Sequence, residues 1–188
     1  VGSSGVGKSS MLRAIAGLWQ RGQGVVTRPP PGQVMFLPQR PYMPLGDLRT
    51  QLLYPDSATS VAASDEGLHA VLDSLGLGTL PARFEGGLDA VCDWGRTLSL
   101  GEQQRLAAAR CLLRQPKVAV LDEATSALPV RDEQRLYERF RDMGIRYISV
   151  GHRASLLAYH DAVLELLGNG EWRLLSPGAY SQEVERVL

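Results

Sequence analysis

One stretch decides the fold: GSSGVGKS at residues 2–9, which fits the pattern G-x-x-x-x-G-K-[ST] at every position. Glycines in such a loop let backbone N–H groups turn inward onto phosphate oxygens, while Lys8 neutralises the β- and γ-phosphates and Ser9 offers a hydroxyl to Mg²⁺. A Gly/Ser linker has a similar composition, but here an amphipathic helix follows directly and aims its positive end at the loop. The stretch predicts a nucleotide phosphate site made of Gly2, Ser3, Ser4, Gly5, Val6, Gly7, Lys8, Ser9 and Ser10.

The composition of the 188 residues is that of a globular domain. Hydrophobic residues make up 44% of the chain, enough for one sizeable core or for two small lobes that share one. The formal net charge is zero, and the lack of a basic excess argues against a nucleic-acid partner. Apolar runs such as 162–167 are far shorter than the roughly 20 residues of a membrane-spanning helix. The two cysteines, Cys92 and Cys111, lack metal-ligand spacing and fit a reducing compartment.

Hydrophobic periodicity predicts alternating helices and strands. Leu12, Ile15, Ala16 and Trp19 share one face, which predicts a helix over 8–19. The other elements follow from caps, apolar runs and Gly/Pro breakers in the same way. We expect strands at 34–37, 118–121 and 147–150, helices at 64–75, 99–116 and 131–142, Gly/Pro-rich or irregular links at 21–33 and 83–97, and a hairpin around 168–170.

This order of elements indicates an α/β sheet with an attached helical lobe. The lobe is expected to span residues 40–115, so that residues 1–39 and 116–188 form the core. Within the lobe, the proline-bounded stretch 41–55 combines a loop and a short helix with surface-type aromatics such as Tyr42. We expect this stretch to be offered to another domain.

The segment VAVLDE, residues 118–123, is the second chemical element. An apolar strand delivers Asp122 and Glu123 to its carboxyl end, where ligands bind in open α/β sheets. Asp122 can hold Mg²⁺ through its water shell, while Glu123 can orient or deprotonate the attacking water. Alone, the pair would suit a solvated acidic turn; together with the loop at 2–9 it predicts a hydrolytic site.

The segment LSLGEQQR, residues 98–105, distinguishes between nucleotide-binding families. It contains a helix capping box, with Ser99 as N-cap and Glu102 three residues later. At this point the sequence resembles the ATP-binding-cassette (ABC) ATPases, whose signature motif is L-S-G-G-Q followed by a basic residue. Leu100 replaces the first Gly and Glu102 replaces the Gln. The resemblance implies that Ser99, Leu100, Gly101 and Glu102 contact the γ-phosphate of ATP held by a second subunit.

Three further positions match this family. Gln39, at the end of VMFLPQ, matches the Q-loop glutamine, and His152, in YISVGHR, matches the switch histidine that contacts the γ-phosphate. With Glu123 they form the implied catalytic set, and Ser9, Gln39 and Asp122 form the implied Mg²⁺ set. In the D-loop, Ser126 matches the family pattern, but Pro129 stands where an aspartate is common, which predicts altered communication between two sites.

The stretches GLWQRGQGVV, PPPGQVMFLPQRPYMPLGDLRTQLLYP and YISVGHRASL are similar to the D subfamily of ABC transporters. The implied fold is a RecA-like P-loop NTPase with a mixed-sheet α/β core and a helical subdomain. The strand before the phosphate loop and an adenine-stacking aromatic would precede Val1, so we expect a fragment of a half-transporter. The implied ligands are ATP and Mg²⁺. The implied partners are a second nucleotide-binding domain and a transmembrane domain of the same polypeptide. The implied location is the cytosolic or stromal face of a membrane, with organellar membranes included.

Three alternatives remain open from the sequence. A non-transport ABC ATPase of the DNA-repair type would insert a long coiled coil between loop and signature, where this chain has about ninety residues without sustained heptads. A P-loop small-molecule kinase would explain neither LSLGEQQR nor the adjacent Asp122 and Glu123. A degenerate cassette that binds ATP and only regulates a partner is hinted at by Pro129, but Glu123 and His152 argue against it.

Overall fold

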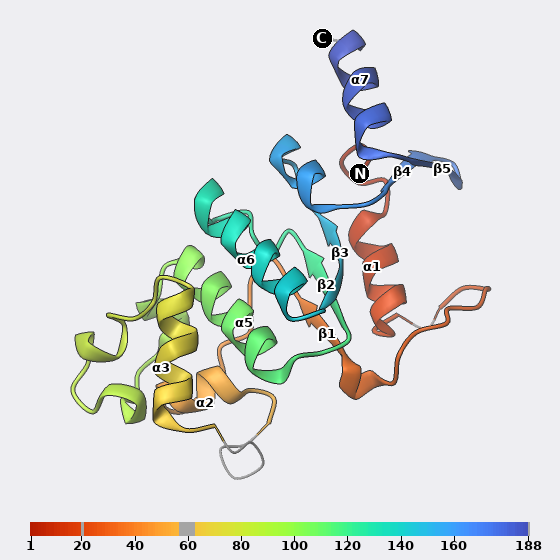
Figure 1. Ribbon diagram of the computed structural model, residues 1–188. Coiled ribbons are helices and arrows are strands. Elements are labelled where there is room, and N and C mark those ends of the chain that lie inside the picture. The colour runs from red at the N-terminus through yellow and green to blue at the C-terminus, as the bar shows by residue number, and fades with distance from the viewer. Residues whose placement is uncertain (20, 57–62, 188) are drawn as a thin grey trace.

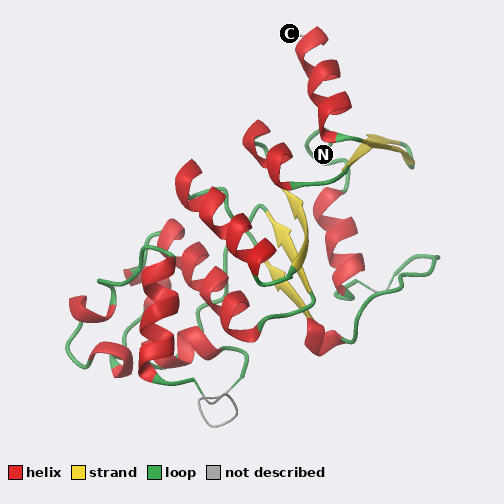
Figure 2. Ribbon diagram, in the orientation of Figure 1, coloured by secondary structure: helices red, strands yellow, loops and turns green. Residues whose placement is uncertain are grey.

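The computed structural model describes residues 1–19, 21–56 and 63–187. At its centre lies a parallel sheet in the order β1-β2-β3, formed by β1 (Val34–Leu37), β2 (Val118–Asp122) and β3 (Arg146–Val150). Figure 2 shows the three strands side by side. Because the strands are parallel, their carboxyl ends meet at one edge, and the residues that follow each strand are brought together there.

Helices cover both faces of this sheet (Figure 1). On one face, α1 (Lys8–Ala16) packs Leu12 against Val120 and Val150. On the other face, α5 (Leu100–Arg114) and α6 (Val130–Asp142) join Leu37 and Leu121 in the larger core, which continues without a break into the helical lobe. The predicted α/β class is confirmed.

Helix α1 is shorter than predicted. It ends at Ala16 because Gly17 takes up the left-handed conformation, with φ at 80°, and caps the helix with its backbone N–H. Trp19, which was expected on the apolar face, lies beyond the helix and is 47% exposed. The prediction of a helix up to residue 19 was wrong because Gly17 is a C-cap and not a tolerated interruption.

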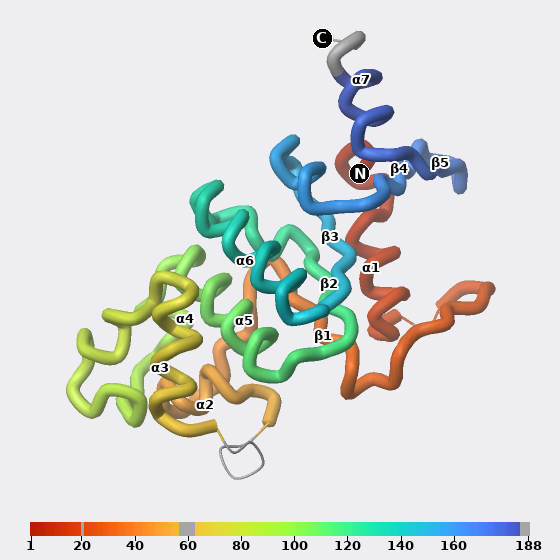
Figure 3. The backbone as a smooth tube through the Cα atoms, in the orientation of Figure 1, coloured from red at the N-terminus to blue at the C-terminus, as the bar shows by residue number. Residues whose placement is uncertain are grey.

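In its described part, the helical lobe contains α2, α3 and α4 besides α5 (Figure 3). The aspartate or serine before each of them accepts a hydrogen bond from the backbone N–H three residues on, as N-cap residues do. Residues 83–97, predicted as an irregular link, contain the short helix α4. The 3₁₀ turns η2 and η3 precede this helix in the chain. The elements are α2 (Leu48–Leu53), α3 (Asp65–Ser74), η2 (Pro81–Arg83), η3 (Gly87–Asp89) and α4 (Trp94–Thr97).

The predicted hairpin is confirmed, with β4 (Val163–Gly168) antiparallel to β5 (Glu171–Leu175). Its turn residues Asn169 and Gly170 have φ of 53° and 82°, the positive values that a tight hairpin turn requires. The remaining elements are η1 (Pro31–Gln33), η4 (Ala154–Tyr159) and α7 (Pro177–Val187). In the part of the chain that the structure describes, none of the helices combines the length and the apolarity needed to cross a bilayer.

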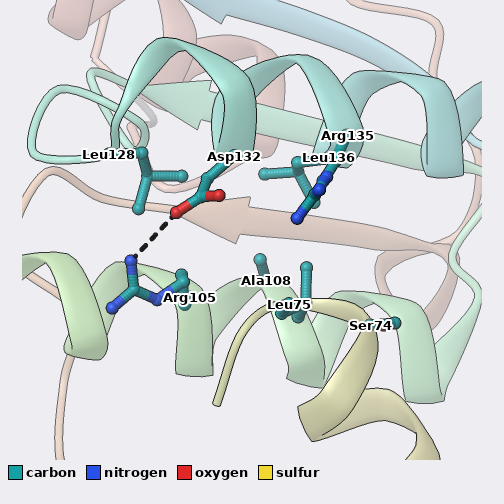
Figure 4. Close-up of a pocket in the computed structure, with 8 residues that line it drawn as sticks. All are labelled: Ser74, Leu75, Arg105, Ala108, Leu128, Asp132, Arg135 and Leu136. Carbon is teal, nitrogen blue, oxygen red and sulfur yellow. Dashed lines mark hydrogen bonds and ion pairs between the residues drawn. The ribbon is translucent and has the colours of Figure 1, made fainter. Parts of the chain in front are cut away.

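A small pocket marks the seam between the lobe and the core (Figure 4). Arg105 on α5 and Asp132 on α6 face each other across it, with 3.3 Å between Nη1 and Oδ2. Leu75, the C-cap of α3, and Leu136 on α6 line the same pocket. One ion pair and apolar contacts therefore connect the layers at this point.

Candidate functional site

The phosphate-loop residues form an irregular turn that leads directly into α1. Gly2, Gly5 and Gly7 have φ of 133°, 78° and 106°, values that residues with a Cβ rarely adopt. The Lys8 ammonium lies over this turn and donates hydrogen bonds to the carbonyl oxygens of Gly2 and Ser3, both at 2.8 Å. Lys8 is thus held above the loop where a phosphate would need its charge.

Asp122 is brought to the start of α1. The Ser9 hydroxyl donates to its Oδ1 at 2.7 Å, and Arg13 Nη2 lies 4.0 Å from its Oδ2. The Asp122 side chain is only 9% exposed, so its orientation is fixed by these neighbours. A hydroxyl and a carboxylate held together are the hard oxygen ligands that Mg²⁺ prefers, and the two residues fit that ion.

Glu123 stands at the point where all three parallel strands end. Its backbone has a positive φ of 52°, and its N–H donates to the carbonyl of Val150 on β3 at 3.1 Å. Gln39 Nε2, just after β1, donates to its Oε2 at 2.8 Å, and His152 Nε2, just after β3, lies 2.9 Å from its Oε1. The three residues of the predicted catalytic set are therefore in direct contact.

Gln104, within the LSLGEQQR segment, has contacts at the site that the sequence did not predict. Its side chain is 1% exposed and connects three segments. Nε2 donates to the Gln39 carbonyl at 2.8 Å and to the Ser126 hydroxyl at 3.2 Å, while Oε1 accepts from the N–H of Ala127 at 2.9 Å. Through Gln104, helix α5 contacts both the segment after β1 and the loop after β2.

The start of α5 carries the four residues expected to act on a second subunit's ATP. The capping box is present: Glu102 N–H donates to Ser99 Oγ at 3.3 Å, and Ser99 N–H donates to Glu102 Oε2 at 2.9 Å. A Cβ built on Gly101 would lie 3.1 Å from the Ala127 carbonyl oxygen, so glycine allows the helix to approach the loop after β2. Leu100 is the first residue of the helix.

Ser126 and Pro129 lie in that same loop. Arg153, directly after His152, donates to the carbonyls of Ser126 at 3.0 Å and Leu128 at 2.7 Å and so ties the loop to β3. Pro129 is the N-cap of α6, and its carbonyl accepts from the N–H groups of Asp132 and Glu133, both at 3.0 Å. The missing N–H of Pro129 therefore interrupts no helical hydrogen bond.

Comparison with known proteins shows the family of this chain. Residues 1–126 match the family described as ABC transporter. The chain belongs to this family. An uncharacterized ABC transporter ATP-binding protein of Synechocystis is 53% identical over 174 residues, a match that covers 93% of this chain and 26% of that protein. The human lysosomal cobalamin transporter, of the D subfamily, is 46% identical over 182 residues. This match covers 93% of this chain and 30% of the transporter.

Among solved structures, the ATP-bound bacterial Atm1-family ABC exporter has a similar fold. The TM-score is 0.78 at 27% identity, and the match covers 97% of this chain and 34% of the exporter chain.

The chloroplastic ABC transporter D family member 2 of Arabidopsis thaliana is a further sequence relative. It is 42% identical over 209 residues, and the match covers 88% of this chain and 30% of that protein. This ABC chain thus spans only about a quarter to a third of the length of the curated relatives (26% to 30%).

Proposed function

We propose that this chain binds and hydrolyses ATP as one of a pair of nucleotide-binding domains that power transport across a membrane. The observation that carries the proposal is the position of Glu123, held between Gln39 and His152 beside the Ser9–Asp122 contact. Gln39, His152 and the adjacent Asp122 and Glu123 come from the ends of three different strands, and the parallel sheet brings them to one edge, beside Ser9 on α1. A hydrolysis reaction at a phosphate bound over α1 would use all of them.

The chemistry divides among these residues in a definite way. The loop at 2–10 and the Lys8 ammonium grip the phosphates of ATP, and His152 faces the γ-phosphate. Glu123 accepts the proton of the attacking water, and Gln39 holds the carboxylate in orientation. Mg²⁺, held by Ser9, Asp122 and Gln39, would neutralise charge on the β- and γ-phosphate oxygens.

A second copy or a related domain would complete each site. The N-terminus of α5 presents Ser99, Leu100, Gly101 and Glu102 to the γ-phosphate bound by the partner, since a helix N-terminus attracts anions. The Ser126 hydroxyl accepts a hydrogen bond from Gln104, near the start of α5. Through this contact Ser126 would connect the two sites. ATP binds the closed pair better than the open pair, and this difference converts hydrolysis into motion.

The conformational change would be transmitted to a partner domain through the stretch 41–55. Tyr42 is 61% exposed and Leu45 is 92% exposed, and both lie within a few residues of Gln39. We propose that a transmembrane domain of the same polypeptide contacts this surface, which would place the chain at the cytosolic or stromal face of a membrane. Accordingly, residues 1–39 and 116–188 would act as the ATPase core, and 40–115 as the lobe that moves with the membrane domain.

The two lysines of the chain allow a matched test of the proposal. Lys8→Ala removes a positive charge from the phosphate site, whereas Lys117→Ala removes one from an exposed position just before β2. In the full-length protein, Lys8→Ala should abolish nucleotide binding and phosphate release, and Lys117→Ala should leave both intact. Equal nucleotide affinity in the two variants would contradict the proposal.

A further inference from the structure

The N-terminus of α5 carries a negative charge where the signature motif commonly has a neutral glutamine. Glu102 is the third residue of this helix, and its side chain is only 17% exposed. Burial alone would raise the pKa of Glu102, but hydrogen bonds from Arg83 and from the backbone and hydroxyl of Ser99 bring that pKa below its usual range. At neutral pH the carboxylate is therefore ionised, at the helix end where the partner's γ-phosphate is to bind.

This carboxylate also engages the residue expected to contact that phosphate. The Ser99 hydroxyl donates its proton to Glu102 Oε2 at 2.9 Å. A hydroxyl has a single proton, so Ser99 can donate to a phosphate only after releasing Glu102. An uncompensated Glu102 would then repel the incoming phosphate and leave the helix end less attractive to an anion.

Arg83 is the compensating charge. Its guanidinium, at the end of η2, forms a hydrogen-bonded ion pair with the other carboxylate oxygen, Oε1 of Glu102. The two oxygens are thus divided between Arg83 and Ser99, and Arg83 remains paired when Ser99 turns away. Arg83 also stacks on Phe84, with 5.7 Å from Cζ to the ring centroid, which holds the guanidinium in place.

We propose that Arg83 is a positioning residue for ATP binding across the pair of domains: it neutralises Glu102 and keeps the N-terminus of α5 attractive to the partner's γ-phosphate. The inference rests on the proposed function, because it needs a phosphate at this helix end. It assigns a role to a residue outside all the motifs that the sequence analysis singled out.

The test is a double-mutant cycle on the full-length protein, with phosphate release measured against ATP concentration. Arg83→Gln should raise the apparent KM for ATP about three- to tenfold, with a smaller change in kcat, as expected for loss of one partly exposed charge pair. In the Glu102→Gln background the same substitution should change KM by less than about twofold, because no charge is left to neutralise. Arg83→Lys, which keeps the charge, should restore a KM within about twofold of the wild type.

Two controls separate an electrostatic role from a structural one. Arg96→Ala removes an exposed arginine whose ion pair, among the residues that the structure describes, is with Asp93, and it should leave KM unchanged. The Arg83→Gln effect should also shrink as the salt concentration rises, because salt screens exposed charges. Loss of packing would instead lower the thermal unfolding midpoint and raise KM equally in both Glu102 backgrounds.

The outcomes separate this inference from the proposed function. An unchanged KM in Arg83→Gln, or an equal rise in both backgrounds, would overturn the role of Arg83 while ATP hydrolysis by the wild type stands. A wild type that neither binds nor hydrolyses ATP would overturn the proposed function, and the role of Arg83 with it.

Discussion

Gln39 and Glu123 are 84 residues apart in the chain, yet the Gln39 amide donates to the Glu123 carboxylate at 2.8 Å. The contact forms because β1 and β2 are parallel neighbours in register, so the residues that follow them emerge at the same edge. His152 binds the opposite oxygen of the same carboxylate at 2.9 Å. The carboxylate of the candidate base is thus oriented from both sides by protein side chains.

Removing one of these two contacts should reduce the rate of ATP hydrolysis more than the affinity for ATP. We expect Gln39→Ala to lower kcat for ATP hydrolysis by about tenfold or more, since a misoriented base loses part of its rate contribution of 10²–10⁴. Nucleotide affinity should change by less than about threefold, because Lys8 and the loop remain. Arg40→Ala, at the exposed neighbouring position, serves as the control; a similar loss of kcat there would argue against a specific role for Gln39.

Glu123→Gln should separate binding from chemistry. The amide keeps the shape of the side chain but cannot accept the proton of water, so phosphate release should fall by at least 10²-fold. ATP should still bind, and the closed pair should accumulate, visible as an ATP-dependent dimer in light scattering. Phosphate release at the wild-type rate would show that another group is the base.

Arg110 is a buried cation that organises the surface near Tyr42. It is 3% exposed and donates to the carbonyls of Gln51 at 2.5 Å and Tyr42 at 2.8 Å, and burial lowers its pKa to about 10. Arg110→Met would leave both carbonyls without this donor, so we expect a loss of about 2–4 kcal/mol of stability. Thermal unfolding would show the change, and Arg139→Met, at an exposed site on α6, should stay within about 0.5 kcal/mol of the wild type.

Asp47 makes the stability of the helical lobe depend on pH. Its carboxylate accepts from the Thr50 N–H at 2.7 Å as the N-cap of α2. Burial would raise the pKa of Asp47, but the hydrogen bonds to Thr50 bring it below its ordinary value of 3.8. Asp47→Ala should cost about 1 kcal/mol near neutral pH, measured by chemical denaturation.

The lowered pKa of Asp47 determines how stability changes with pH. The charged form is the one that folding favours, so its contribution is complete above the ordinary pKa of 3.8 and is lost as the pH falls through the lower value in the folded chain. The stability difference between wild type and Asp47→Ala should therefore shrink in acid. Asp47→Asn keeps an N-cap side chain but has no titratable charge. If the stability of Asp47→Asn fell in acid as steeply as that of the wild type, groups other than Asp47 would cause the pH dependence.

Local signals explain what could be predicted from the sequence. The bounds of β1 were correct because Pro38 ends an apolar run, and the start of α5 was correct because Ser99 and Glu102 form a capping box. Asn169 and Gly170 marked the hairpin turn in the same way. Each of these signals is contained within a few neighbouring residues.

Tertiary contacts explain what could not be predicted. Gly17 gives the same sequence signal whether it interrupts a helix or ends it, and the structure shows that it ends α1 in the left-handed conformation. Gln104, Arg110 and Arg83 act through partners that lie between 19 and 68 residues away, such as Gln39 for Gln104 and Glu102 for Arg83. A single sequence contains no local pattern that reports such pairings.

The most direct test of the account mixes two defective copies of the full-length protein, one with Lys8→Ala and one with Ser99→Arg. If α5 of one copy completes the phosphate site of the other, each mixed pair contains one site with both lesions and one intact site. Phosphate release should then recover above the level of either variant alone. A mixture as inactive as its two components would contradict the account, because each copy would then be building its site alone.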